Sequence, residues 1–353
     1  MDLTPAFWRG RRVFVTGHTG FKGSWLALWL ERLGANVTGY AIDVPTMPSL
    51  YEAAGVADGV RSITGDVRDL GALGAAMRSG RPEIVFHLAA QSLVRRSYDE
   101  PLETFATNVL GTANVLDVAR RLDGLRSVVV VTSDKAYRPG LTPHAEDDRL
   151  GGDDPYSASK AGAELVTAAY RHSFFSTRGP AVASARAGNV IGGGDWARDR
   201  LVPDLMRAAL DRSTAFVRNP GHVRPWQHVL GPLAGYLGLA ERLSEEPALA
   251  AAWNFGPTEE EARSVRWLVE ALVERWPASI SVSFQETEDA GREAPALRLD
   301  STRARDLLGW RPAWSLERAL DTTVEWYRAF EAGEDVRSLA LAQIGRYEAD
   351  GRR

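Results

Sequence analysis

The sequence of 353 residues predicts an α/β fold, in which a doubly wound parallel sheet is joined by a smaller mixed α/β lobe. Short β-branched runs alternate with stretches of helical periodicity through the first half of the chain, as they do in parallel sheets. A glycine-rich turn connects the first of these runs to the first helical stretch. From about residue 188 the alternation fades and the chain becomes richer in Gly, Pro, Trp and Arg, which indicates a second structural unit.

The first predicted strand, Arg12–Thr16, precedes the turn GHTGFKG (residues 17–23) and the apolar stretch SWLALWLERLGA. A strand, a glycine turn and a helix in this order are typical of a Rossmann-type unit, because glycines let the backbone approach a pyrophosphate at the helix N-terminus. The spacing GxxGxxG is a variant of the commoner GxGxxG. A dinucleotide is therefore expected to contact Gly17, Thr19, Gly20, Phe21, Lys22 and Gly23.

The second predicted strand, Asn36–Ile42, is followed directly by Asp43. An acidic side chain at this point can accept a hydrogen bond from the 2′-hydroxyl of a ribose and repels a 2′-phosphate, so the sequence favours NAD over NADP as the cofactor. Asp43 could instead cap a loop.

The third and fourth predicted strands, Val60–Gly65 and Ile84–Ala90, complete the expected cofactor site. Residues after the third strand would lie over the adenine, and the small residues that end the fourth would let the backbone lie against the cofactor. A helical stretch, Asn108–Arg121, comes before the next strand. The further candidates for cofactor contact are Asp66, Val67, Leu88, Ala89, Ala90 and Asn108.

The fifth predicted strand, Val128–Thr132, leads directly to Ser133, Asp134 and Lys135. In open α/β sheets the reactive groups lie just beyond the carboxyl ends of the strands. These three residues and Thr132 are therefore candidates for catalysis.

Tyr156 and Lys160 lie four residues apart, so on a helix both side chains project from one face. The ammonium and the positive charge of an oxidised nicotinamide would lower the pKa of the phenol. Tyr156 could then take the proton of a substrate hydroxyl while hydride leaves the carbon, and Thr132 or Ser133 would share the hydrogen bond of that hydroxyl. Both Tyr156 and Lys160 would also contact the cofactor. Alternatively, the two residues are only exposed at helical spacing.

Asp134 and Lys135 suggest chemistry beyond alcohol oxidation. A ketone at one sugar carbon makes the neighbouring C–H acidic, so a neutral lysine can take that proton while a carboxylic acid protonates a leaving β-hydroxyl. The chain has 42 Lys plus Arg but only three lysines, of which two are Lys135 and Lys160 and the third is Lys22. Lys can lose its proton where Arg cannot, which favours functional roles for all three. A structural ion pair between Asp134 and Lys135 is the alternative.

The second half of the chain contains a further strand, Val182–Ala187, followed by GNVIGGGDW. Later elements are expected as helices at 201–211, 265–275 and 316–329 and as strands at 214–218 and 280–284, whereas 340–353 is too polar to assign. We expect a cofactor domain at 1–187 with a return segment near 225–255, and a substrate lobe at 188–224 and 256–353.

Arginines recur in this lobe together with Trp196 and Trp226. Arg suits bidentate recognition of phosphate, so this density fits a substrate that carries a diphosphate. The two tryptophans are expected to pack in the core more readily than to stack on a base. The candidates for substrate binding are Gln91, Ser92, Arg186, Asn189, Arg200, Leu201, Arg218, Arg224 and His228.

The composition excludes several other classes. A net charge of -4 without a basic cluster argues against nucleic-acid or membrane-surface binding. The absence of Cys excludes disulfides, thiolate catalysis and Cys-ligated zinc, and no metal site is expected. The N-terminal segment has no apolar signal-like region and no apolar run is long enough to span a bilayer, so a cytoplasmic location is expected.

Long segments of the chain resemble the extended short-chain dehydrogenase/reductase family, and within it the nucleotide-sugar 4,6-dehydratases. The segments are TGHTGFKGSWL (16–26), VTSDKAY (131–137), LGGDDPYSASKAGAELV (150–166), SARAGNVIGGGDWARDRLVPD (184–204), RNPGHVRPWQHVLGPLAGYL (218–237) and LDSTRARDLLGWRP (299–312). Dehydratases that act on dTDP-glucose have Asp-Glu where this chain has Asp134-Lys135, so Lys135 argues against dTDP-glucose as the substrate. The resemblance implies a CDP-sugar.

The resemblance implies NAD-dependent dehydration of CDP-glucose to CDP-4-keto-6-deoxyglucose. C4 is oxidised with Tyr156 as the base, water leaves across C5 and C6 with Asp134 and Lys135 as acid and base, and hydride returns to C6. A homodimer or homotetramer is also implied, with a dimer contact formed by the helices that carry 101–120 and 156–171.

Three alternatives stay open. Another nucleotide-sugar 4,6-dehydratase would differ only in its substrate. A C4-epimerase or a decarboxylase on the same fold would not need an acid–base pair for C5 and C6, which Asp134 and Lys135 provide. A non-catalytic NAD-binding sensor would have no need for Tyr156 and Lys160.

Overall fold

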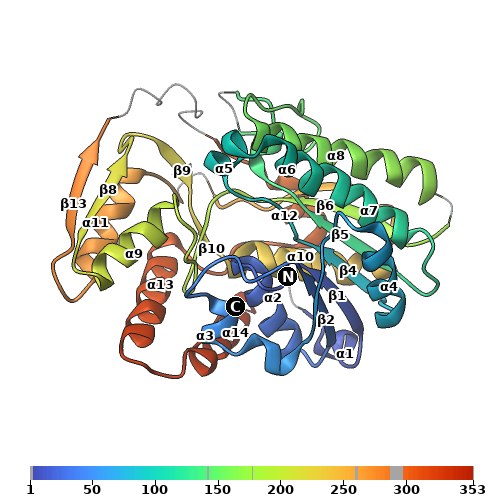
Figure 1. Ribbon diagram of the computed structural model, residues 1–353, viewed down its shortest axis with the longest axis horizontal. Coiled ribbons are helices and arrows are strands. Elements are labelled where there is room, and N and C mark those ends of the chain that lie inside the picture. The colour runs from blue at the N-terminus through green and yellow to red at the C-terminus, as the bar shows by residue number, and fades with distance from the viewer. Residues whose placement is uncertain (1–2, 141–142, 177, 259–260, 287–296, 353) are drawn as a thin grey trace.

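The computed structural model describes residues 3–140, 143–176, 178–258, 261–286 and 297–352. Its centre is a seven-stranded sheet of order β11-β6-β5-β4-β1-β2-β3, in which every neighbouring pair is parallel (Figure 1). The strands are β1 (Arg12–Thr16), β2 (Asn36–Ala41), β3 (Arg61–Thr64), β4 (Ile84–His87), β5 (Ser127–Val131), β6 (Ala181–Arg186) and β11 (Ala252–Asn254). The strand order reverses between β1 and β4, which confirms the predicted doubly wound Rossmann-type sheet.

Successive side chains of the central strands enter two different apolar cores, one on each face of the sheet. Phe14 and Val128 pack in the core that includes residues of α4 (Leu70–Gly80) and α7 (Gly111–Ala119), whereas Val13 and Val129 belong to the core that includes α2 (Phe21–Arg32) and α10 (Leu230–Glu245). Figure 1 shows α4 and α7 on one side of the sheet and α2 and α10 on the other. Burial on both faces explains why these strands read as continuous apolar runs.

Short helices fill the connections around the sheet, and α8 is the long helix that contains the Tyr-x-x-x-Lys motif. These elements are α1 (Pro5–Trp8), α3 (Leu50–Ala53), the 3-10 helix η1 (Val56–Gly59), α5 (Val94–Asp99), α6 (Pro101–Phe105), the π-helix η2 (Ala106–Leu110), the 3-10 helix η3 (Asp134–Ala136), α8 (Pro155–Phe174) and the 3-10 helix η4 (Pro247–Leu249). Among the described residues, no helix combines the length and the apolar character that a bilayer crossing requires.

A smaller group of elements lies beside the sheet, at the left of Figure 1. Its parallel pair β8 (Thr214–Arg218) and β13 (Ser281–Gln285) lies with α9 (Leu201–Leu210) and α11 (Val265–Arg275), close to the predicted bounds. The other elements are the pair β7 (Val190–Ile191) and β10 (Gln227–His228), the pair β9 (Val223–Pro225) and β12 (Ala262–Ser264), and the helix α13 (Leu316–Glu331). The helix α12 (Thr302–Leu308) instead contacts α10 and the strand β11 of the sheet.

The last helix, α14 (Val336–Gly351), covers the segment that we could not assign from the sequence. Its buried residues include Val336, Ala340, Ile344 and Tyr347, which recur at helical spacing. The sequence of this segment therefore contains an apolar helix face, but a narrow one. Tyr347 packs edge-on against Trp29 of α2 at a centroid distance of 5.8 Å. The polar composition of this segment therefore reflects a helix with one covered face.

Gly193, which follows β7, packs against Trp326 of α13, and a Cβ there would lie 2.0 Å from Cγ of the ring. We expect Gly193→Ala to lower the free energy of unfolding by about 1–3 kcal/mol, because neither the chain nor the buried ring can move aside without strain. Urea unfolding would measure the loss. The matched control is Gly221→Ala, since no atom lies within 4 Å of the added Cβ. Equal stability of the two variants would contradict the packing argument.

Candidate active site

A cavity of about 1340 Å³ opens at the carboxyl edge of the parallel sheet. Its lining comes from the segments that follow β1, β2, β4 and β5, from the start of α8, and from α9 and β8 of the smaller group. Most of the predicted site residues meet here. They are Gly17, Thr19, Gly20, Phe21, Lys22, Gly23, Asp43, Asp66, Val67, Leu88, Ala89, Ala90, Gln91, Ser92, Thr132, Ser133, Asp134, Lys135, Tyr156, Lys160, Asn189, Arg200, Leu201, Arg218 and Arg224.

Two glycines of the glycine turn, Gly17 and Gly23, are packed so closely that a side chain could not replace their hydrogens. Gly17 has a φ of 73°, and a Cβ on it would lie 2.8 Å from the amide nitrogen of Ala89. A Cβ on Gly23 would lie 2.0 Å from the carbonyl oxygen of Gly17. Thr19 donates a hydrogen bond of 2.6 Å to the carbonyl of Asp43, which fixes the turn against the end of β2. Backbone amides at the start of α2 are thus left facing the cavity, where they suit a pyrophosphate.

Lys22 lies in the first turn of α2 and lines the same cavity. A cation is unfavourable at a helix N-terminus, and within the described part of the chain its ammonium makes no hydrogen bond or ion pair. Burial lowers the pKa of Lys22 to about 8, helped by the charge of Arg200 and opposed by Asp134 and Asp195. An unpaired positive charge in this place is available to an anionic ligand.

Tyr156 and Lys160 begin α8, which Asp154 caps by accepting a hydrogen bond from the amide of Ser157. Both side chains are buried, and burial raises the pKa of Tyr156 to about 12, against the influence of Ser133 and Arg200. The predicted lowering depends on Lys160 and an oxidised nicotinamide together, so it stays a prediction beside this raised pKa. Burial lowers the pKa of Lys160 to about 8, and the charge of Lys22 contributes to this shift.

Ser133 and Asp134 follow β5 and are both buried at the base of the cavity. Ser133 donates a hydrogen bond of 2.9 Å to a carboxylate oxygen of Asp134. Burial raises the pKa of Asp134, although the charge of the adjacent Lys135 and the bond from Ser133 oppose the shift. A carboxyl group in such surroundings is suited to hold a proton and to donate it.

Thr132 and Ser133 were equal candidates for the hydrogen bond to a substrate hydroxyl, and the structure separates them. The hydroxyl of Thr132 donates to Glu164, inside the core. Ser133 donates to Asp134 at the cavity and acts to lower the pKa of Tyr156. Thr132 is therefore corrected from a catalytic candidate to a residue that contacts Glu164, and Ser133 remains the candidate.

The opposite wall of the cavity carries Arg200, whose guanidinium connects two parts of the chain. It forms an ion pair of 3.1 Å with Asp195 and donates a hydrogen bond of 3.1 Å to Ser92, which follows β4. Arg218 lies 3.6 Å from Asp199 on the same side. With Lys22 and Lys160 on the sheet side, this wall makes the cavity positively charged, as an anionic substrate requires.

Three predicted site residues do not line the cavity. Asn108 bonds both the amide and the carbonyl of Gln91, at 2.9 Å each, and so holds the segment after β4. Arg186 is buried in an ion pair with Glu164 and does not face a phosphate site. His228 is enclosed by Trp25 and Trp314, with centroid distances of 6.1 and 4.9 Å. Each of these assignments is corrected from ligand contact to internal support.

Some cavity residues had not been singled out from the sequence. Asp195 belongs to the recognised GGGDW segment, and its pairing with Arg200 was not visible there. Ala215, Phe216 and Val217 lie on the correctly predicted β8, but an apolar strand carries no sign of ligand contact. Trp196 and Trp226 line the cavity and also pack, since Trp196 lies edge-on to Tyr327 at 5.1 Å and Trp226 donates to the carbonyl of Arg263.

The Rossmann-type sheet, the glycine turn and the Tyr-x-x-x-Lys motif at one cavity define an extended short-chain dehydrogenase/reductase. The family model of GDP-mannose 4,6 dehydratase matches residues 14–323. The chain belongs to this family.

Two of the similar sequences illustrate how much of the chain is covered. It is 47% identical over 349 residues to CDP-glucose 4,6-dehydratase of Salmonella typhimurium, which covers 97% of both chains. It is 31% identical to dTDP-glucose 4,6-dehydratase of Streptomyces griseus, over 89% of this chain and 93% of the relative. Among solved structures, dTDP-glucose 4,6-dehydratase from Streptomyces venezuelae, with NAD bound, superposes with a TM-score of 0.78 at 26% identity, over 92% of this chain and 99% of the other.

Proposed function

We propose that this protein dehydrates CDP-glucose to CDP-4-keto-6-deoxyglucose with NAD as its cofactor. The observation that carries the proposal is the placement of Asp134 and Lys135 at the same cavity as Tyr156 and Lys160. One pair suits proton and hydride transfer at an alcohol, and the other suits loss of water from the resulting ketone. The relative from Salmonella typhimurium, a CDP-glucose 4,6-dehydratase, supports the choice of base and sugar.

The cofactor would lie on the sheet side of the cavity. The glycine turn and the N-terminus of α2 suit its pyrophosphate, and Asp43 suits the adenosine ribose. Bound NAD would supply the hydride acceptor for C4 and later return the hydride to C6. We assign residues 1–187 with the return segment near 225–255 to the cofactor domain, and 188–224 and 256–353 to the substrate lobe.

The residues of the chain would move the protons. Tyr156 takes the proton of the C4 hydroxyl, and Ser133 shares the hydrogen bond of that hydroxyl. Once C4 is a ketone, the Lys135 amine takes the C5 proton and Asp134 gives a proton to the C6 hydroxyl, so the C6–O bond breaks and water leaves. Lys135 then returns a proton to C5. The cycle consumes no oxidant and releases one water.

The diphosphate of the substrate would lie against the opposite wall, with Arg200, Arg218 and Arg224 as its candidate contacts. Arg recognises phosphate oxygens through its planar fork of donors. A C4-epimerase is the second candidate, because a UDP-glucose 4-epimerase of Mycolicibacterium smegmatis is 28% identical over 90% of this chain. The Asp134–Lys135 pair favours dehydration, since epimerisation requires no proton transfer at C5.

We also propose a homodimer or homotetramer located in the cytoplasm. The helices expected to form the dimer contact expose large apolar side chains: Leu102 is 84% exposed, Leu110 52% and Leu165 62%. Apolar side chains that gather in this way are typical of an interface.

Isotope transfer tests the dehydration. In heavy water, the product from unlabelled CDP-glucose should gain one deuterium at C5, because Lys135 exchanges its proton with solvent. In ordinary water, deuterium placed at C4 of the substrate should appear at C6 of the product. Mass spectrometry and NMR would locate both labels, and retention of the original C5 hydrogen would rule the mechanism out. Turnover of CDP-, dTDP-, UDP- and GDP-glucose in parallel would test the choice of base.

A further inference from the structure

A buried ion pair joins α8 to strand β6 directly behind the reactive residues. Arg186 donates a hydrogen bond of 2.8 Å to Glu164, and each side chain is 3% exposed. Neither residue lines the cavity. Burying two charges costs more than a surface pair gains, so such a pair is weak evidence for stability and calls for another role.

Glu164 places this pair on the helix of the hydride-transfer residues. It follows Lys160 by one helical turn and Tyr156 by two, so the three side chains lie along one face of α8. Its carboxylate also accepts hydrogen bonds from Ser184, at 2.6 Å, and from Thr132. The end of β5 is thus attached to α8 through Thr132.

Arg186 contacts Tyr137, which lies on the C-terminal side of the segment that carries Asp134 and Lys135. It donates a hydrogen bond of 2.6 Å to the hydroxyl of Tyr137, and its guanidinium lies 4.7 Å from the centre of the Tyr137 ring. Thr132 and Tyr137 bracket residues 133–136, so the stretch that carries Asp134 and Lys135 is held at both ends by one ion pair.

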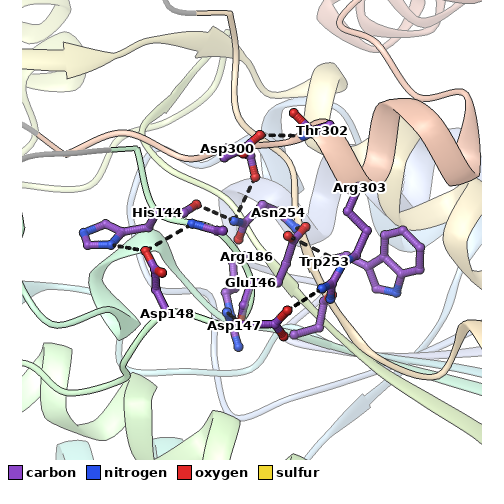
Figure 2. A network of polar contacts seen from close by, with 12 residues as sticks. His144, Glu146, Asp147, Asp148, Arg186, Trp253, Asn254, Asp300, Thr302 and Arg303 are labelled. Atoms are coloured by element: carbon purple, nitrogen blue, oxygen red, sulfur yellow. Dashed lines mark hydrogen bonds and ion pairs between the residues drawn. The ribbon is translucent and has the colours of Figure 1, made fainter.

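Tyr137 continues the contacts away from the cavity. Its hydroxyl donates a hydrogen bond of 2.8 Å to Asn254 of β11, and its ring stacks on His144 at 4.7 Å. Figure 2 shows the Asn254 amide between the carbonyl of His144 and that of Asp300, which it bonds at 2.8 and 3.0 Å. Tyr137 is therefore linked to the edge strand β11 of the sheet through Asn254.

We infer that Glu164, Arg186 and Tyr137, here called the anchor cluster, are positioning residues that fix the Asp134–Lys135 pair relative to the Tyr156–Lys160 pair. The inference rests on the proposed function, in which the two pairs act in turn on neighbouring carbons of one bound sugar. None of these three residues lines the cavity, and the cluster is joined to both pairs through the chain of β5 and α8. The charge of Glu164 also acts to raise the pKa of Lys160, against the effect of burial. Displacement of a reacting group by about 1 Å can reduce a rate by roughly 10²-fold, so such an attachment matters for catalysis.

The test separates the two stages of the reaction in the variant Tyr137→Phe. This change removes the hydroxyl that Arg186 and Asn254 hold and keeps the ring. A single turnover with CDP-glucose would be monitored. The formation of reduced nicotinamide reports C4 oxidation, and the formation of the 4-keto-6-deoxy product reports water loss. Deuterium uptake at C5 is measured in heavy water. We expect water loss and C5 uptake to fall by about 10-fold to 100-fold relative to C4 oxidation.

The matched control is Tyr347→Phe, because this buried hydroxyl accepts a hydrogen bond of 3.1 Å from the amide of Ala313, and Tyr347 does not line the cavity. Thermal unfolding of both variants would show comparable losses of stability, yet the control should keep the wild-type ratio of the two stages. A folded Tyr137→Phe protein with the wild-type ratio would overturn the inference.

A second variant, Thr132→Val, cuts the attachment at the other end of the segment with little change of shape. This variant should also lower the rate of water loss relative to that of C4 oxidation. It tests the inference independently if Tyr137→Phe does not fold. An unchanged ratio in Thr132→Val with intact folding would also overturn the inference. Failure of the proposed function would look different, because the wild-type protein would then form no dehydrated product.

Discussion

The double variant Asp134→Asn with Lys135→Met is expected to lose dehydration of CDP-glucose by a factor of about 10³ or more while it still binds NAD. Asn cannot donate the proton that the leaving hydroxyl needs, and Met has no amine to take the C5 proton. Both residues lie at the end of β5, beside the glycine turn but not in it, so the cofactor contacts stay intact. Product formation by mass spectrometry and titration with NAD would measure the two effects.

The single variants separate the two roles. With Asp134→Asn alone, Lys135 keeps its amine, so the C5 hydrogen should still exchange with heavy water although water is not expelled. With Lys135→Met alone, that exchange should stop. Dehydration by the double variant within about tenfold of the wild-type rate would remove both assignments.

Most of the fold could be predicted because its signals are local. The β-branched runs and the helical stretches between them reflect burial on two faces of a sheet, and the glycine turn reflects close backbone contacts that leave no room for a Cβ at Gly17 and Gly23. The α14 helix was missed because only one narrow face, with Val336, Ile344 and Tyr347, is covered. Its partner, α2, lies more than 300 residues earlier in the chain, so its burial cannot be recognised locally.

The residues of the candidate site could be predicted where they follow a strand or a glycine turn. The prediction failed where the direction of a side chain depends on a partner that is distant in the sequence. Arg186 and Arg200 look alike in the sequence, yet Arg186 points to Glu164 in the core and Arg200 to Ser92 and Asp195 at the cavity. Register and helix packing decide between the two directions. His228 illustrates the same limit, because the two tryptophans that enclose it come from α2 and from the segment before α13.

Replacement of Tyr156 by Phe is expected to slow C4 oxidation by a factor of about 10²–10⁴, since it removes the phenol that we propose as the base for the C4 hydroxyl. Burial raises the pKa of Tyr156 to about 12, so the phenol is a poor base unless positive charge lies close to it. Lys160 is the residue we expect to supply that charge, from one helical turn away. Single-turnover measurement of reduced nicotinamide would report the loss, and a Phe variant within tenfold of the wild-type rate would contradict the role.

The pH dependence of C4 oxidation tests the pairing of Tyr156 with Lys160. The ammonium of Lys160 is the protonated form, and burial lowers its pKa to about 8, so the charge is present below this pH and lost above it. The rate of C4 oxidation should rise with pH because the Tyr156 phenol deprotonates more readily. It should fall beyond about pH 8 because Lys160 then loses its charge. Lys22 titrates in the same range, which makes Lys22→Gln the matched control. In that variant the fall should move to higher pH, because the charge of Lys22 lowers the pKa of Lys160, whereas in Lys160→Met the fall should disappear. A fall that persists unchanged in Lys160→Met would assign it to another group.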